Sequence, residues 1–241
     1  MSLTPKERLI VALDYPSAEQ ALKFVEQMGD SVIFYKVGLE LFSAAGPDIV
    51  TRLKSLGKAV FLDMKFHDIP NTVAGAAARA VAMGADIFNV HALGGMAMMR
   101  AAAAAASEAA SRLGVKRPTV LAVTVLTSMD REALEREAGI HVGEGIGTFV
   151  AAKARQAKEA GLDGVVASPH EVSDVRSVCG NDFEIITPGV RPAWASSDDQ
   201  KRVATPFEAL KMGADRIVIG RPITRAKNPH EAVERILAEI G

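Results

Sequence analysis

The sequence predicts a (β/α)8 barrel, also called a TIM barrel, that forms a single domain over residues 1–241. Three observations favour this fold. Eight short apolar runs recur along the chain, helix-favouring segments rich in Ala, Leu, Glu, Lys and Arg separate them, and the runs follow one another at intervals of about 30 residues. Each interval has the length of one strand, one helix and their connections, so eight of them fill a barrel of ordinary size.

The predicted strands are continuous apolar runs, as expected of parallel strands that are buried on both faces. In chain order they cover residues 9–13, 32–37, 59–64, 86–90, 119–126, 164–167, 183–187 and 216–220. The clearest predicted helices between them cover Ala18–Met28, 72–83 and 145–160. The alanine run at 101–106 is typical of a helix packed closely on a barrel, and residues 132–137 predict a short amphipathic helix.

A local repeat supports the same architecture. The segments MGADIFNV (83–90), AGLDGVVA (160–167) and MGADRIVI (212–219) each predict a helix end, a glycine just past it, a short turn and a strand. The competing fold is a doubly wound open sheet. Its dinucleotide-binding version has no support, because no Gly-x-Gly-x-x-Gly motif follows the first strand.

The composition excludes several classes of protein. Lys+Arg 28 against Asp+Glu 29 gives a net charge of -1, which argues against a nucleic-acid or membrane partner. The single cysteine, Cys179, can form neither an internal disulfide nor a multi-cysteine zinc site. The first apolar run is too short for a signal peptide, and no run is long enough to span a membrane. We expect a cytoplasmic enzyme or small-molecule binder.

Polar residues mark the ends of the predicted strands. Active sites of such barrels lie at the C-terminal ends of the strands, where converging charges can also partner one another. The residues at these ends are Asp14, Lys36, Asp63, Lys65, His91, Thr127, Ser128, Ser168, Arg191, Gly220 and Arg221.

The densest charged group is Asp63-Met64-Lys65-Phe66-His67-Asp68. Asp63 and Lys65 are two residues apart, so they share one face of a strand, and neighbouring carboxylates keep the lysine protonated as a proton donor. A structural interpretation remains, in which the group is an ion pair and Asp68 caps a helix that starts at Pro70. That interpretation leaves Lys36, at the end of the preceding strand, unexplained. Interleaved lysines and aspartates are costly for stability alone and favour a catalytic role.

A second group of residues fits a phosphate. Gly220 and Arg221 follow the last strand, where barrels often bind phosphate with backbone N–H groups and a guanidinium. The long polar loop at 188–206 carries Arg191 and Gln200 and predicts a lid, with a solvated surface loop as the alternative. No histidine has metal-ligand spacing with another histidine or with Cys179, so no metal site is predicted.

The sequence resembles a known family. The motifs LIVALDYPS, YKVG, FLDMKFHDIPNTV, LTSM, ITPGVRP and IGRPIT occur in order over essentially the whole chain and resemble the orotidine 5′-phosphate decarboxylases of the bacterial type. The resemblance implies a lyase that decarboxylates orotidine 5′-phosphate to UMP, the last step of de novo pyrimidine biosynthesis. It also implies that the reaction needs no metal or organic cofactor.

The resemblance further implies a role for each site residue. Lys65 would donate a proton to C6 of the pyrimidine, and Asp63 would lie beside the departing carboxylate. Lys36 would hold Asp63 and bond the ribose, which Asp14 would also bond. The remaining implied contacts are Thr127 and Ser128 to the pyrimidine, Arg191, Gln200, Gly220 and Arg221 to the phosphate, and Asp68 and Thr72 to the neighbouring site of a homodimer.

The residues are compatible with three other functions. Metal-dependent sugar-phosphate decarboxylases and lyases of the same superfamily share an Asp-x-Lys-x-x-Asp pattern, but they resemble one another in a metal-binding Glu where this chain has Lys36. A Schiff-base aldolase would need a lowered pKa at Lys65, which flanking aspartates oppose. A non-catalytic nucleotide-binding barrel is disfavoured by the intact set of charged residues.

Overall fold

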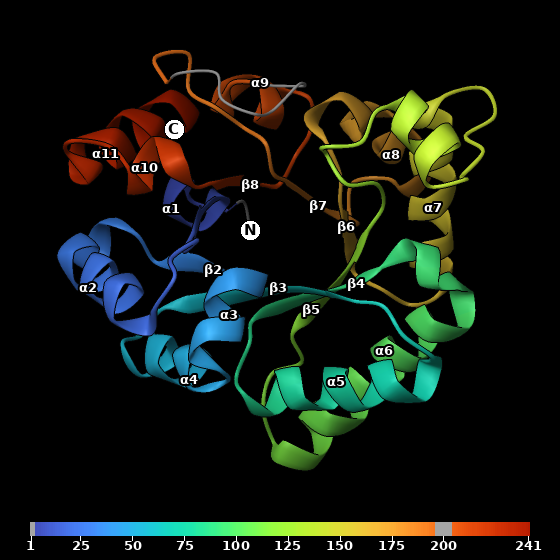
Figure 1. The fold of residues 1–241 in the computed structure, drawn as a ribbon, viewed down its shortest axis with the longest axis horizontal. Helices are drawn as coiled ribbons and strands as arrows, with labels where there is room; N and C mark the ends of the chain where they lie inside the picture. Colours follow the sequence, from blue (N-terminus) through green and yellow to red (C-terminus); the bar gives the residue numbers. More distant parts are fainter. Residues whose placement is uncertain (1–2, 196–203) are drawn as a thin grey trace.

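The computed structural model describes residues 3–195 and 204–241. Eight parallel strands close into a barrel in which each strand pairs with the next along the chain and β8 pairs with β1 (Figure 1). The strands are β1 Leu9–Ala12, β2 Phe34–Gly38, β3 Ala59–Phe66, β4 Ile87–His91, β5 Thr119–Val123, β6 Gly164–Val166, β7 Glu184–Thr187 and β8 Arg216–Ile219. The predicted TIM barrel is therefore confirmed.

The strand ends agree with the predicted runs to within about three residues. The largest difference is at β5, which ends at Val123 and not at residue 126. Val123 pairs with Val166, the last residue of β6, so the ladder that holds β5 on this side stops there. β3 is longer than predicted and ends at Phe66, so Lys65 lies within the strand.

Helices surround the barrel on its outside (Figure 1). They are α2 Ala18–Met28, α3 Leu39–Ala45, α4 Asp48–Ser55, α5 Pro70–Ala82, α6 Gly95–Leu113, α7 Ile146–Glu159, α8 Val172–Cys179, α9 Pro206–Lys211 and α11 Pro229–Ile240, with the single turns α1 Pro5–Arg8 before β1 and α10 Arg221–Thr224 after β8. Residues 132–137 form a π-helical turn at Ala133–Glu137 that buries Leu134. None of the described helices is long and apolar enough to cross a membrane.

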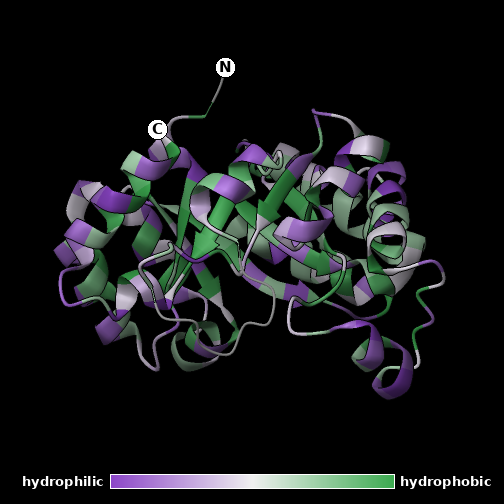
Figure 2. Cartoon of the chain, turned by 90° about the horizontal axis from the view of Figure 1, so that it is seen from above, coloured by the Kyte–Doolittle hydropathy of each residue, from purple (hydrophilic) through white to green (hydrophobic). Residues whose placement is uncertain are grey.

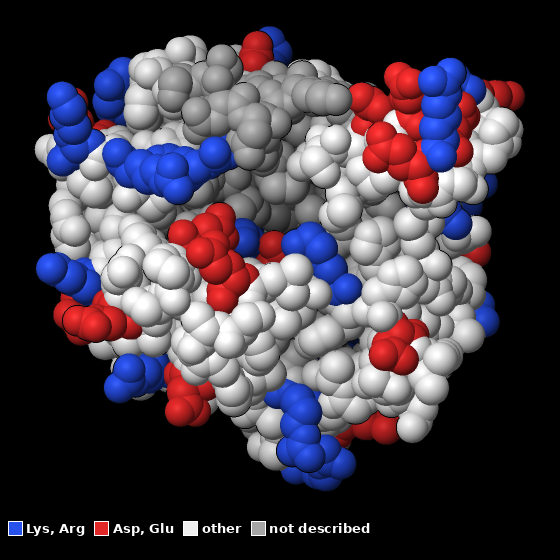
Figure 3. Space-filling model, in the orientation of Figure 1, with Lys and Arg blue, Asp and Glu red and all other residues white. Residues whose placement is uncertain are grey.

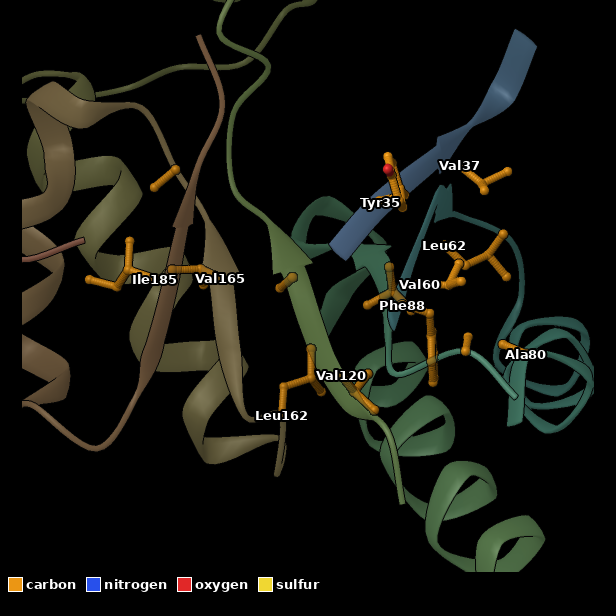
Figure 4. Close-up of a cluster of buried hydrophobic side chains, with 14 of the residues drawn as sticks. Tyr35, Val37, Val60, Leu62, Ala80, Phe88, Val120, Leu162, Val165 and Ile185 are labelled. Atoms are coloured by element: carbon orange, nitrogen blue, oxygen red, sulfur yellow. The ribbon is translucent and has the colours of Figure 1, made fainter. Parts of the chain in front are cut away.

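Two apolar layers pack against the sheet. The larger one lies between strands and helices, where Tyr35, Val60 and Phe88 point outward from the barrel (Figure 4). The strands are the most hydrophobic part of the molecule, and the helices carry many of their polar residues away from them (Figure 2). The second layer fills the barrel interior and consists of Ile10, Ala12, Phe34, Phe61, Ile87, Leu121, Val123, Val166, Ile186 and Val218.

Along the strands, the inward-facing positions that follow this interior layer are occupied by polar residues. Side chains alternate along a strand, so residues two apart share a face. Continuing two residues beyond Ala12, Phe34, Phe61 and Ile87 reaches Asp14, Lys36, Asp63 and Asn89. The barrel is thus apolar inside and polar at its C-terminal mouth.

The three repeated segments close the opposite end of the barrel. Gly84, Gly161 and Gly213 have φ of +82°, +86° and +106°, which confirms the turn that the repeat predicts. In each copy, the aspartate two residues after the glycine accepts a hydrogen bond from the backbone N–H of the second residue of a neighbouring strand. The same aspartate also forms an ion pair with a lysine or an arginine. These contacts are Asp86 with Val60 N–H and Lys54, Asp163 with Val120 N–H and Arg117, and Asp215 with Ile185 N–H and Arg176. We call these three residues the turn aspartates.

Candidate active site

Asp63 lies at the centre of the polar mouth, almost fully buried at 9% exposure. Its Oδ1 accepts hydrogen bonds from Lys65 Nζ and Asn89 Nδ2, both at 2.7 Å. Its Oδ2 lies 3.4 Å from Lys36 Nζ, which also donates to Asp14 Oδ1 at 3.1 Å. Asp14, Lys36, Asp63 and Lys65 therefore form a continuous line of alternating charges, which we call the charged cluster.

Ion pairing sets the charge state of the two buried members. Burial alone would raise the pKa of Asp63, but Lys36 and Lys65 outweigh it, so the pKa lies below its usual value. Burial alone would lower the pKa of Lys36, but Asp63 and Asp14 outweigh it, so that pKa lies above its usual value. At neutral pH both groups are therefore ionised, because their charged partners offset the effect of burial.

Lys65 has an unusual backbone. Its φ is +53°, and among the described residues it is the only one other than glycine with a positive φ. Such a conformation costs about 1–3 kcal/mol and persists where the surroundings hold it. The pairing of β3 with β4 shifts between Leu62 and Phe66, and the Lys65 N–H donates to Asn89 Oδ1 at 2.7 Å.

Asn89 is a site residue that was not predicted from the sequence. It lies on β4 and is completely buried. The available signal was an amide at an inward-facing position within the apolar run DIFNV, where a buried polar group requires hydrogen-bond partners. Those partners lie on β3, which the sequence of β4 does not reveal.

A cavity of about 200 Å³ opens beside the charged cluster. Its lining includes Asp14, Lys36, Arg191, Gly220 and Arg221, five of the predicted substrate-binding residues. The face in Figure 3 is hollowed near its centre, and acidic and basic side chains gather around the hollow. The fold thus brings the predicted phosphate-binding groups next to the lysine–aspartate line.

The two described ends of the predicted lid are held together. Val190 bridges to Ala204, and the Arg191 N–H donates to the Ala204 carbonyl at 2.9 Å. Arg191 itself is buried at 6% exposure. Gln200 lies outside the described residues, so its predicted phosphate contact stays a prediction, as does closure of the loop.

Asp68 and Thr72 do not join the charged cluster within one chain. Both are exposed, and Asp68 Oδ1 accepts from the Ile69 N–H at 2.6 Å. The alternative interpretation, in which Asp68 caps α5, is contradicted, because Ile69 occupies the N-cap position and no side chain caps it. Asp14, and not Asp68, supplies the second carboxylate to Lys36.

The other predicted contacts are more peripheral in this chain. Thr127 is half-buried and Ser128 is exposed, on the loop after β5, and neither is hydrogen-bonded to the charged cluster within the described residues. His91 stacks on His67 with ring centroids 5.3 Å apart, and burial, helped by His67 and Lys65, lowers the pKa of His91. Among residues 3–195 and 204–241 no group of three or more His, Cys, Asp or Glu residues could hold a metal ion.

The class of protein follows from this mouth: it is a barrel enzyme for a small molecule, because Lys36, Arg191 and Arg221 line a cavity at the catalytic end of the barrel. A family model described as "Orotidine 5′-phosphate decarboxylase / HUMPS family" matches residues 7–236. The chain belongs to this family, and it is a decarboxylase, a carboxy-lyase.

Individual relatives agree with this assignment. The chain is 54% identical to an orotidine 5′-phosphate decarboxylase of Moorella thermoacetica, covering 98% of this chain and 92% of that protein. It is 50% identical to one of Syntrophomonas wolfei, covering 98% of both. The crystal structure of orotidine 5′-phosphate decarboxylase from Lactobacillus acidophilus is 40% identical, with a TM-score of 0.85 over 97% of this chain and 98% of that one.

Proposed function

We propose that this chain decarboxylates orotidine 5′-phosphate to UMP without metal or organic cofactor, as a cytoplasmic enzyme of pyrimidine biosynthesis. The observation that carries the proposal is the Lys65 ammonium held 2.7 Å from the buried Asp63 carboxylate, within the line that Lys36 and Asp14 continue. The names of the relatives supply the substrate.

The reaction needs one bond broken and one proton delivered. The bond between C6 and the carboxylate breaks, CO2 leaves, and its electron pair remains on C6. Lys65 Nζ then donates a proton to C6, which gives UMP, and the neutral amine recovers a proton from solvent. The ammonium stabilises the negative charge developing on C6, and the Asp63 charge beside the substrate carboxylate raises the energy of the ground state.

The remaining residues bind the parts of the substrate that do not react. Arg191, Gly220 and Arg221 line the cavity and suit the phosphate. Gln200, which lies outside the described residues, is proposed to bind the phosphate as well. Asp14 and Lys36 line the same cavity and suit ribose hydroxyls. Thr127 and Ser128 are proposed to contact the pyrimidine. Binding energy from the phosphate can close the predicted lid and orient the reacting ring.

A single assay tests substrate, reaction and cofactor independence together. Purified protein is treated with EDTA and mixed with orotidine 5′-phosphate, and the loss of its absorbance and the appearance of UMP are followed. We expect full turnover. Absence of turnover would contradict the proposal, and full activity on a ketose phosphate that EDTA abolishes would instead favour the metal-dependent sugar-phosphate lyases of the superfamily.

We also propose that the enzyme is a homodimer in which Asp68 and Thr72 reach the neighbouring site. Both residues are exposed in one chain, and the apolar residue Ile69, which lies between them in the sequence, is 67% exposed.

Mixing inactive Lys65→Ala and Asp68→Ala proteins tests whether the site is shared between subunits. Random exchange of subunits would restore about a quarter of the parental activity, because half of the dimers then carry one intact site. No recovery after verified exchange would contradict sharing.

A further inference from the structure

We propose that Asn89 is a positioning residue whose one amide group fixes both the backbone of Lys65 and the carboxylate of Asp63. The inference rests on the proposed function, because it concerns the proton donor of that reaction. It assigns to β4 a part in the chemistry, in addition to β2, β3 and the segment that follows β1, which carry the charged cluster.

The amide is bonded on both sides. Asn89 Oδ1 accepts from the Lys65 backbone N–H at 2.7 Å, and Asn89 Nδ2 donates to Asp63 Oδ1 at 2.7 Å. The same Asp63 oxygen accepts from Lys65 Nζ at 2.7 Å. The three residues thus close a ring of hydrogen bonds in which Asn89 holds Lys65 at its backbone and the partner of Lys65 at its side chain.

The backbone of β3 needs such a support at this point. Leu62 pairs with Phe88 and Phe66 pairs with Val90. An advance of four residues along β3 therefore corresponds to an advance of only two residues along β4. Lys65 lies inside this irregular stretch and has a φ of +53°, a backbone conformation that residues other than glycine rarely adopt. Asn89 lies between Phe88 and Val90, directly opposite the irregular stretch, and supplies an acceptor there. Without it, we expect the stretch to relax and Lys65 Nζ to move.

An amide also suits the electrostatics of the position. The charged groups around it are Lys36 on β2 and Asp63 and Lys65 on β3, with His91 two residues further along β4. A carboxylate at 89 could still accept from the Lys65 N–H but would face an Asp63 oxygen with a second negative charge. A leucine of similar size would make neither bond. The two contacts can therefore be separated by substitution.

The test compares Asn89→Leu and Asn89→Asp with the parent enzyme. We expect Asn89→Leu to lower kcat about 100-fold, since a displacement of about 1 Å of a reacting group has that effect. KM and the affinity for UMP should stay within about threefold, because the phosphate-binding residues are untouched. Asn89→Asp should lose kcat at neutral pH and regain it as the pH falls, because a protonated carboxyl can again donate to Asp63.

Thr124→Val is the matched control. Thr124 is also completely buried, and its hydroxyl donates to the Val166 carbonyl, away from the charged cluster. It should lose some stability and keep kcat. The inference is overturned if folded Asn89→Leu keeps kcat within about twofold of the parent, or if Thr124→Val loses as much. A pH profile for Asn89→Asp parallel to that of the parent also overturns it.

A crystal structure of Asn89→Leu separates this inference from the proposed function. We expect Lys65 to leave the positive-φ region or its Nζ to leave Asp63. An unchanged Lys65 would overturn the inference whatever the protein's substrate. Failure of the parent enzyme to turn over orotidine 5′-phosphate would overturn the proposed function alone.

Discussion

The bottom and the mouth of the barrel use the same chemical groups in different ways. At the bottom, each turn aspartate pairs with one cation and one backbone N–H, and its side chain is between 32% and 40% exposed. At the mouth, the Asp63 side chain is 12% exposed and contacts two lysines and an amide. Separate, partly exposed pairs stabilise these turns at low cost, whereas concentrated, desolvated charges cost folding free energy and are typical of a reaction site.

Lys65→Ala tests the mouth most strongly. We expect kcat to fall by at least about 10³-fold, because the variant loses its general acid as well as a charge near the developing carbanion. Thermal stability should change little, because Lys65 is half-buried and Asp63 keeps Lys36 and Asn89. Turnover of orotidine 5′-phosphate, measured beside a melting curve, checks both. Turnover at the parental rate would rule out Lys65 as the donor.

Asp63→Asn should affect both activity and folding. The substitution keeps the size of the side chain but leaves the mostly buried Lys36 with Asp14 alone. We expect a loss of about 3 kcal/mol in the free energy of unfolding and a fall in kcat of about 100-fold. Urea unfolding and steady-state kinetics measure the two effects. A variant as stable as the parent would mean that the charged cluster contributes nothing net to folding.

Asp215→Ala is the corresponding change at the bottom. It leaves the Ile185 N–H without its acceptor and removes the carboxylate beside Arg176. We expect a loss of about 1–3 kcal/mol in the free energy of unfolding, with kcat unchanged at temperatures where the protein is folded. Urea unfolding and kinetics on the same preparation provide the measurement. A clear fall in kcat would show that the two ends of the barrel are coupled.

The pH dependence of stability should also distinguish the mouth. The lowered pKa of Asp63 stabilises the fold above its unfolded value of about 3.9, and this contribution disappears as the pH falls through the folded pKa. The raised pKa of Lys36 stabilises the fold below about 10.4 and is lost as the pH rises through the folded pKa. Urea unfolding at a series of pH values should therefore show that the free energies of unfolding of the parent and of Asp63→Asn become more similar below about pH 4.

Gly38→Ala should have the smallest effect. A Cβ there would lie 2.7 Å from Lys36 Nζ, while the backbone, with φ at −98°, accepts any residue. We expect kcat to fall about tenfold through displacement of Lys36, with almost no change in melting temperature. Gly84→Ala, at a φ of +82° at the bottom, should instead lower stability by about 1 kcal/mol and leave kcat unchanged. Equal effects on kcat would contradict this contrast.

Much of the site was predictable because alternation along strands is local. Asp14, Lys36, Asp63 and Lys65 were identified at strand ends, and the structure joins them in one line. Asp68 belongs to the densest charged group of the sequence, but within one chain it lies on the exposed segment before α5 and bonds the next residue of the chain. Asn89 was missed because its meaning depends on the pairing of β4 with an irregular part of β3.

The sequence by itself determined the barrel, the turns at its bottom and the inward-facing register, because apolar runs, glycines past helix ends and a period of two are properties of short segments. Only the tertiary structure decided which charges meet. Asp14 lies 22 residues from Lys36, and Asn89 lies 26 residues from Asp63. Such pairs come within hydrogen-bond distance only when neighbouring strands align, and a shift in register at one bulge changes which atoms face each other.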